Sequence, residues 1–236
     1  APGAAAAAAP RAMFACCEQP SVQQDLPGAP KGAELLYFPV TALGEPLRLT
    51  MAIGSMDFKD TTPANDEDFA KKKAELSPYG ALPVLVLEGK PMPQARAILR
   101  YLGKVLQYEG KPLYPADALE AYHCDELIEL VEDVRAPLAG TFAIKDQAEK
   151  EKARGALFAE DGKMTQWLAK LDKRLESFGP SVHIGDIYAF CIVNMLRQPT
   201  FIDGIPKDSL DKYSNLTKHH EFVAKLPPVL GYYKDK

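Results

Sequence analysis

Between residues 33 and 107, short apolar runs alternate with amphipathic helical patterns. The predicted strands cover residues 35–38, 57–60, 83–87 and 90–92, and the predicted helices cover residues 45–55, 66–75 and 95–106. Glu88-Gly89 lies between the last two strands and is a hairpin signal. The resulting order, βαβαββα, predicts a small α/β layer.

Beyond about residue 115 the apolar residues keep only a helical spacing. They recur at Leu127, Leu130, Val131, Val134 and Leu138, and again at Met164, Trp167, Leu168, Leu171, Leu175 and Phe178. Residues 187–196 are apolar on every side except at Asn194, which predicts a helix enclosed by others. The charged run 145–154 is typical of a solvated helix face. We therefore expect an α/β domain at residues 33–107 and an all-α domain at residues 108–236.

Residues 1–32 differ in composition from the rest of the chain. Six consecutive alanines, Ala4 to Ala9, precede a stretch with several prolines and few large apolar side chains. Such a segment buries too little surface to offset the entropy of ordering it, which predicts an arm outside both domains. Two interpretations stay open: a passive tail, or an arm that docks on a partner. Few acidic residues are also typical of the remnant of an organelle-targeting region.

The composition excludes several classes of function. Among 236 residues there are 28 Lys and Arg against 32 Asp and Glu, and a net charge of −4 gives no footprint for nucleic acid or an anionic membrane surface. No apolar run reaches the roughly 18–20 residues of a membrane span, so we expect a chain that does not span a membrane. The four cysteines include no CxxC pair, which excludes a zinc ribbon and a redox dithiol.

The positions of two cysteines and three histidines indicate structural roles rather than metal binding. Cys124 and Cys191 fall on apolar helix faces and are predicted to be core residues. His123 and the pair His219-His220 lack partners at metal-ligand spacing, so we expect surface or capping histidines and no metal site.

Two features of the first half point to ligand chemistry. Tyr37 leaves the first apolar run just before the loop at residues 40–44, where its hydroxyl can stabilise a ligand thiolate; a plain core aromatic is the alternative. Leu82-Pro83 opens the strand at 83–87, and a proline in that place is a candidate cis peptide. The backbone N–H and C=O of Leu82 are then expected to pair with an extended peptide ligand.

Four motif blocks occur in order along the chain: Tyr37-Phe38-Pro39, Gly44-Glu45-Pro46-Leu47-Arg48, Pro78-Tyr79-Gly80-Ala81-Leu82-Pro83 and Gln94-Ala95-Arg96-Ala97-Ile98-Leu99-Arg100-Tyr101-Leu102. Together they resemble the glutathione transferase family, and most closely its tyrosine-type, sigma-like class. In the helical half, Val182-His183-Ile184-Gly185-Asp186 resembles the capping-box loop of the family, and residues 216–232 resemble its terminal helices. The resemblance covers residues 33–236 and implies a thioredoxin-like domain followed by an all-helical domain, the glutathione transferase fold.

The resemblance also implies a site for glutathione as co-substrate. Tyr37 matches the catalytic tyrosine, whose hydroxyl donates to the glutathione sulfur and favours the thiolate. Leu82 and Pro83 match the backbone clamp for the cysteinyl group, and Gln94 matches a ligand of the γ-glutamyl group.

Three further residues match family positions at the two ends of glutathione. Phe69 and Lys73 match the pair that holds the glycyl carboxylate, provided that the loop before Pro78 carries one extra residue. Asp133 matches a carboxylate that reaches the γ-glutamyl amine across a dimer interface, so the resemblance implies a homodimer.

Three departures from the family pattern count against full activity. Ala95 stands where the family has a serine that binds the γ-glutamyl carboxylate, and a lost hydrogen bond to a charged group costs about 1.5–3 kcal/mol. The helix N-terminus still offers amides to an anion, and Arg96 is a partial substitute. His183 replaces the usual Ser or Thr of the capping box. Leu43 stands where this class often has an arginine that activates the thiol.

Several acidic residues have a structural interpretation. Asp186 is expected to satisfy backbone donors at the start of the central helix. Glu129, Glu132 and Asp133 form either a solvated helix face or a carboxylate cluster for a divalent cation at a dimer interface.

Two hypotheses about function therefore stay open. The first is an enzyme, a glutathione transferase that conjugates or isomerises a small electrophile in a pocket between the two domains. The second is a non-catalytic subunit of a larger assembly, docked through residues 1–32, because a fold alone does not imply a function. The cytoplasm is the default compartment, and the lumen or stroma of a plastid, after removal of a targeting sequence, is the alternative.

Overall fold

A four-stranded mixed sheet forms the centre of the first half of the chain. The computed structural model describes residues 30–198 and 202–234. The strands are β1 (Ala33–Leu36), β2 (Phe58–Thr61), β3 (Val84–Leu87) and β4 (Lys90–Pro93), in the order β2-β1-β3-β4. β1 runs parallel to β2 and antiparallel to β3, which pairs antiparallel with β4 through the predicted hairpin at Glu88-Gly89. The central strands β1 and β3 carry most of the buried apolar residues of the sheet.

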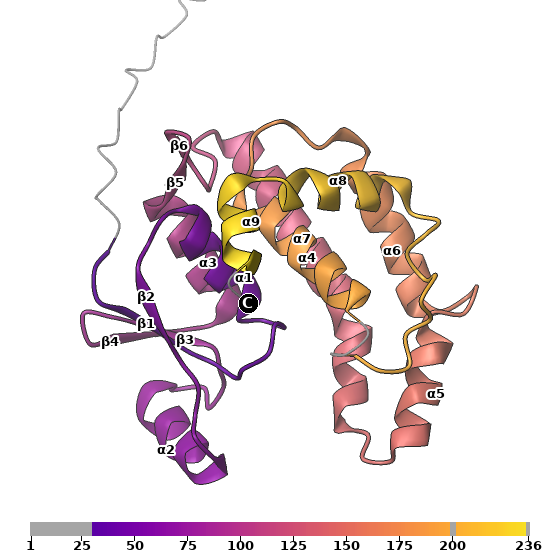
Figure 1. The fold of residues 1–236 in the computed structure, drawn as a ribbon, viewed down its shortest axis with the longest axis horizontal. Coiled ribbons are helices and arrows are strands. Elements are labelled where there is room, and N and C mark those ends of the chain that lie inside the picture. The colour runs from indigo at the N-terminus through magenta and orange to yellow at the C-terminus, as the bar shows by residue number, and fades with distance from the viewer. Residues whose placement is uncertain (1–29, 199–201, 235–236) are drawn as a thin grey trace, which may run out of the picture.

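Three helices pack around this sheet. They are α1 (Glu45–Ile53), α2 (Asp66–Leu76) and α3 (Ala95–Val105). α1 begins with Pro46 in its first turn, where a missing N–H costs nothing, and the Asn65 side chain caps α2 by accepting from the Asp68 N–H over 2.8 Å. Figure 1 shows α1 and α3 between the sheet and the second half of the chain, whereas α2 lies apart from them.

The second half is helical. Its α-helices are α4 (Ala118–Ala139), α5 (Gln147–Leu157), α6 (Lys163–Arg174), α7 (Ile184–Arg197), α8 (Ser214–Ala224) and α9 (Pro227–Lys234). Single 3-10 turns follow α4 at Gly140–Ala143 and α6 at Leu175–Ser177. α7 is enclosed by α4, α8 and α1, as its apolar surface predicts, and Figure 1 shows it in the middle of the bundle. The predicted fold class, a small sheet domain followed by a helical domain, is confirmed.

The two halves share one hydrophobic core, and α1 is the element that joins them. α1 packs on α3 of its own half and on α7 and α9 of the helical half. The Tyr233 hydroxyl of α9 donates to Glu45 Oε1 of α1 over 3.1 Å, and Glu45 is 2% exposed. Because α9 is tied to α1 in this way, the end of the described chain helps to fix the position of the first half.

Three details of the sequence prediction are corrected. A two-stranded ribbon, β5 (Gln107–Tyr108) and β6 (Lys111–Pro112), lies between α3 and α4 and was not predicted, because two-residue strands have no periodicity. Arg154, the last residue of the charged run, is 2% exposed rather than solvated; it pairs with Asp203 and donates to Thr141 Oγ1 over 3.0 Å.

The third correction concerns His219, which was expected to be a surface or capping residue. Its side chain is buried, and its Nε2 lies 3.1 Å from Asp186 Oδ1 at the start of α7. Asp186 Oδ2 also accepts from the His183 N–H over 2.9 Å, so the predicted structural role of this carboxylate is confirmed.

Cys124 and Cys191 are buried, as predicted, while Cys16 and Cys17 lie outside the described residues, as does most of the arm at residues 1–32. Over residues 30–198 and 202–234, no helix is both long and apolar enough to cross a membrane. The domain boundaries at residues 32 and 107 remain predictions.

Candidate functional site

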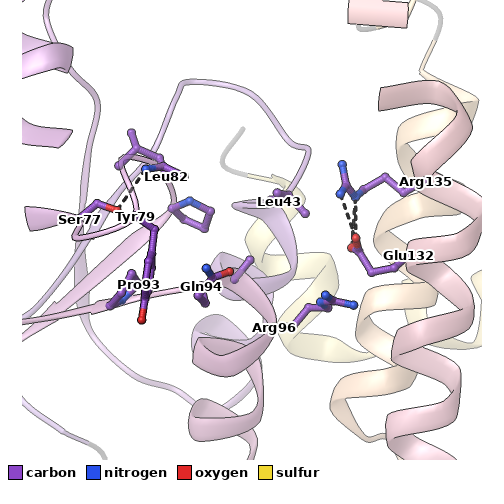
Figure 2. A pocket seen from close by; sticks show the side chains of 12 residues that line it. Leu43, Ser77, Tyr79, Leu82, Pro93, Gln94, Arg96, Glu132 and Arg135 are labelled. Atoms are coloured by element: carbon purple, nitrogen blue, oxygen red, sulfur yellow. Dashed lines mark hydrogen bonds and ion pairs between the residues drawn. The ribbon is translucent and has the colours of Figure 1, made fainter. Parts of the chain in front are cut away.

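A cleft of about 190 Å³ lies where α4 of the helical half faces the sheet domain. Leu82, Pro83, Gln94 and Ala95 of the predicted site line it, as Figure 2 shows for the labelled members. The remaining lining residues are Leu43, Ser77, Tyr79, Ala81, Pro93, Arg96, Glu132 and Arg135. The cleft thus joins the loop after β1, the segments that flank β3 and β4, the start of α3, and α4.

The loop that enters β3 forms one wall of the cleft. The peptide bond between Leu82 and Pro83 is cis, as the sequence predicts. Ser77 holds the loop: its Oγ accepts from the Ala81 N–H over 3.1 Å, and its carbonyl accepts from the Gly80 N–H over 3.0 Å. Gly80 has a φ of 61°, a value that glycine adopts without a steric penalty. Leu82 is therefore presented to the cleft by a short, hydrogen-bonded turn.

The start of α3 forms a second wall. Gln94 is the N-cap residue and has a φ of 78°, and Ala95 is the first residue of the helix. The first turn of a helix has backbone N–H groups without partners inside the helix, and they carry partial positive charge. This end of the cleft can therefore receive an anion even though Ala95 brings no hydroxyl.

Tyr37 lies beside the cleft and is 7% exposed. It follows β1 directly, and its hydroxyl oxygen accepts a hydrogen bond from the Leu43 N–H over 3.3 Å. Its ring packs against Gly44, and the Arg48 guanidinium lies 5.7 Å from the ring centroid. Tyr37 itself does not line the cleft, but Leu43, whose N–H it accepts from, does.

The electrostatic surroundings keep the Tyr37 phenol protonated. Burial raises its pKa, and the Leu43 N–H and the positive charges of Arg135 and Arg48 oppose this rise without cancelling it. Because the hydroxyl oxygen already accepts from Leu43, its own proton is available for another acceptor. Within the described residues, no acceptor for that proton is present.

Phe69, Lys73 and Asp133 do not line the cleft. Phe69 lies on α2 with its ring 4.9 Å from that of Phe38, and the Lys73 ammonium sits 4.9 Å from the Phe69 ring centroid. Asp133 is exposed on α4. The role implied for Asp133 needs a second copy of the chain. The roles of Phe69, Lys73 and Asp133 therefore stay predictions.

A triad on the helical side of the cleft was missed by the sequence analysis. Arg135 donates to Glu132 through Nε, at 3.1 and 3.2 Å, and through Nη2, at 2.9 Å. The Tyr188 hydroxyl of α7 also donates to Glu132 Oε1. Burial acts to raise the pKa of the Glu132 carboxyl, but the hydrogen bonds from Arg135 and Tyr188 outweigh it and hold the pKa below its usual value. The i,i+3 spacing on α4 signals an ion pair, but not that it faces a cleft.

A second, smaller pocket of about 40 Å³ adjoins the cleft at Arg135, which lines both. The other lining residues are Ala42, Leu138, Ala139, Phe142, Tyr188, Cys191, Ile192 and Met195. Because Arg135 is the one charged residue among these, this apolar pocket suits a small apolar molecule beside the polar cleft.

The carboxylates of α4 are largely paired with arginines in the described chain. Glu129 pairs with Arg96 and Arg100, and Glu132 pairs with Arg135. Residues 30–198 and 202–234 of a single chain contain no group of three or more His, Cys, Asp or Glu side chains that could hold a metal ion, and a cation at a dimer interface stays a prediction. Two of the three acidic residues are therefore engaged by arginines within the chain.

Comparison with known proteins gives consistent results from sequence and structure. Residues 132–236 match the family described as glutathione S-transferase, C-terminal domain. A glutathione S-transferase of Anopheles gambiae is 34% identical over 204 residues, covering 82% of this chain and 96% of the relative. Glutathione S-transferase 1 of Ascaris suum is 27% identical over 201 residues, covering 83% of this chain and 92% of the relative.

The comparison of structures leads to the same fold. The prostaglandin synthase D of Nilaparvata lugens superimposes with a TM-score of 0.73 at 26% identity, covering 87% of this chain and 98% of the other. Thus the likeness includes both the sheet domain and the helical domain.

Proposed function

Because the chain belongs to the glutathione S-transferase family, we propose that it binds glutathione in the cleft and uses the thiolate to attack a small electrophile. The observation that carries the proposal is the Tyr37 hydroxyl, which accepts from the Leu43 N–H at the edge of the cleft and keeps its proton for a ligand. The names of the relatives, among them the Anopheles gambiae transferase, support the same reaction class.

Tyr37 is proposed to donate its hydrogen bond to the glutathione sulfur. A free thiol titrates near 8.5, so most of it is protonated at neutral pH. Lowering that pKa by about two units corresponds to about 2.7 kcal/mol, which a hydrogen bond to an anion in a secluded site largely supplies. Since burial raises the pKa of Tyr37, the phenol remains a donor at the pH where the thiolate forms.

The walls of the cleft suit the rest of the tripeptide. The backbone of Leu82 is proposed to pair with the cysteinyl group, and Gln94 with the γ-glutamyl group. The γ-glutamyl carboxylate is proposed to lie at the N-terminus of α3, where Ala95 offers backbone amides only. Phe69 and Lys73 are proposed to hold the glycyl carboxylate, and the partner subunit's Asp133 is proposed to reach the γ-glutamyl amine in a homodimer.

The electrophile is proposed to bind in the apolar pocket between α4 and α7. This pocket meets the cleft at Arg135, so an electrophile held there faces the cysteinyl end of glutathione. The reaction is then conjugation, in which the sulfur forms a bond to the electrophile, or isomerisation, in which glutathione is released again.

The test is a calorimetric titration with glutathione, combined with a conjugation assay on a chromogenic aryl halide. We expect a Kd in the micromolar to low-millimolar range for the unaltered chain. Tyr37→Phe keeps the ring that packs against Gly44 and Arg48, so we expect a similar Kd, a fall in kcat/KM of at least tenfold and a raised pKa of the bound thiol. The control is Tyr122→Phe, at an exposed position near the start of α4. An unchanged rate and thiol pKa in Tyr37→Phe would show the mechanism to be wrong.

The same titration separates the enzyme from the alternative, a non-catalytic subunit docked through residues 1–32. That alternative predicts no binding of glutathione by the unaltered chain and loss of its partner when the arm is deleted. Residues 1–29 lie outside the described part of the chain, so no observation on the arm favours it. The homodimer and the compartment remain predictions in either case.

A further inference from the structure

We infer that Arg135 of α4 is a catalytic residue that supplies positive charge to the glutathione thiolate from the helical side of the cleft. The inference rests on the proposed function, because it requires glutathione in the cleft. It assigns to α4 a charge that the loop after β1 does not provide, since Leu43 is apolar and lines the same cleft.

Arg135 lies where the cleft and the apolar pocket meet. It lines both the cleft and the apolar pocket, so it stands at the junction where the thiol and the electrophile must meet. Figure 2 shows its side chain extending from α4 across the space toward Leu43, whose N–H is bonded to the Tyr37 hydroxyl. On this inference, a sulfur that accepts from Tyr37 lies between the phenol and the guanidinium.

Glu132 binds one edge of the Arg135 guanidinium. Glu132 occupies Nε and Nη2, and the Tyr188 hydroxyl holds Glu132 in turn. Among residues 30–198 and 202–234, Nη1 donates no hydrogen bond of regular geometry, although the Tyr188 hydroxyl is near enough to act on the guanidinium. Arg135 is thus fixed on one edge and keeps donors on the other, the arrangement of a group that is positioned to receive an anion.

The other cations near the cleft are already engaged. Arg48 donates to Asp60 and to the carbonyls of Phe38 and Val40, and Arg96 pairs with Glu129. The groups that interact electrostatically with Arg135 are Glu132, Tyr188 and Tyr37, and Arg96 also acts on Glu132. Among them, Glu132 opposes the effect of Arg135 on a nearby anion, so we expect a contribution smaller than that of Tyr37.

The field of Arg135 already acts on the neighbouring phenol. Its charge lowers the pKa of Tyr37 against the larger effect of burial. The same positive charge should lower the pKa of a thiol that lies between the two groups. When this thiol ionises, its S–H bond breaks, the proton passes to solvent and the sulfur keeps the electron pair. Arg135 stays protonated throughout and takes no proton in the step.

The test measures the pKa of the bound thiol from the ultraviolet absorbance of the thiolate as a function of pH. We expect Arg135→Met to raise this pKa by about one unit, a tenfold loss of thiolate or about 1.4 kcal/mol, with a matching fall in kcat/KM at neutral pH. Arg135→Lys, which keeps the charge but not the bidentate pair with Glu132, should show a smaller rise. The control is Arg174→Met. Arg174 of α6 is about as exposed as Arg135 and pairs with Glu126 of α4, away from the cleft.

A second ligand separates an effect on the sulfur from an effect on the rest of glutathione. S-methylglutathione has no ionisable thiol, so its Kd should be unchanged in Arg135→Met. Equal losses of affinity for glutathione and S-methylglutathione would overturn the inference, because Arg135 would then hold a carboxylate. A shift of thiol pKa in Tyr37→Phe without one in Arg135→Met would overturn it while leaving the proposed function intact. If the unaltered chain binds neither ligand, both fail.

Discussion

The backbone N–H of Leu43 donates to the Tyr37 hydroxyl over 3.3 Å, and this single bond links the loop after β1 to the edge of the cleft. The phenol oxygen is the acceptor in this bond, so the bond does not use the phenol's own proton. The relationship depends on a close approach of the next residue, Gly44, to the Tyr37 ring. A Cβ built on Gly44 would lie 2.4 Å from Tyr37 Cδ1 and 2.9 Å from Arg48 Nη1.

We predict that Gly44→Ala displaces the Tyr37 ring. Arg48 is held by Asp60 and two backbone carbonyls, so the ring rather than the guanidinium must give way. Overpacking of this kind costs about 1–3 kcal/mol, and the displaced hydroxyl should lower kcat/KM at least tenfold. Urea unfolding and the conjugation assay measure the two effects.

The matched control is Gly155→Ala inside α5, where an added Cβ would have no atom of the described chain within 4 Å apart from its neighbours in the helix. Alanine is a better helix former than glycine, so this variant should be slightly more stable and fully active. If Gly44→Ala behaves in the same way as Gly155→Ala, the packing of Tyr37 does not depend on the glycine.

We predict that Ala95→Ser tightens glutathione binding. The serine hydroxyl would stand at the first residue of α3, beside the amides proposed to receive the γ-glutamyl carboxylate. A hydrogen bond to a charged group contributes about 1.5–3 kcal/mol, so the Kd should fall by about 10- to 150-fold. Calorimetry with glutathione measures the change.

Ala97→Ser serves as the control for that experiment, because Ala97 is exposed on the same helix and does not line the cleft. Its Kd should equal that of the unaltered chain. If Ala95→Ser leaves the Kd unchanged as well, the carboxylate does not lie at the start of α3.

The order of elements could be predicted from the sequence because periodicity is a local property. Apolar residues two or three to four positions apart predict strands and helices without knowledge of the fold, and the α/β and helical halves follow from them. β5 and β6 were missed because two-residue strands contain too few positions for a pattern. The burial of Arg154 was missed because its partner Asp203 lies 49 residues further along the chain.

The candidate site could be predicted where it depends on short motifs. Leu82, Pro83, Gln94 and Ala95 occur in two such motifs, and the fold brings them into one cleft. Arg135 could not be predicted because its role depends on where α4 faces the sheet domain. Along the sequence it is simply the basic partner of Glu132 at i,i+3, a pair that is usually exposed.

The surroundings of His220 predict a loss of stability at acidic pH. Arg197 Nη1 lies 3.1 Å from Nδ1 of His220, and an arginine nitrogen can only donate, so Nδ1 must be the acceptor. The proton is then on Nε2, which lies 3.3 Å from Asn194 Oδ1. Phe190 stacks on the ring at 4.7 Å between centroids. The folded structure therefore fits the neutral imidazole, and a second proton would face the Arg197 charge.

Burial, and then the charge of Arg197, lowers the pKa of His220 from 6.5 to about 4. In the unfolded chain the imidazole binds a proton near 6.5, so between pH 6.5 and 4 the unfolded state binds more protons than the folded state. The free energy of unfolding should be independent of this group above about pH 7 and fall as the pH decreases from 6.5 to 4. We expect His220→Gln to reduce this dependence in urea unfolding curves at several pH values, whereas His123→Gln, at an exposed position on α4, should retain it. A dependence that is identical in the unaltered chain and in His220→Gln would show that the imidazole binds its second proton at the same pH in the folded and unfolded states, and that its pKa is not lowered by folding.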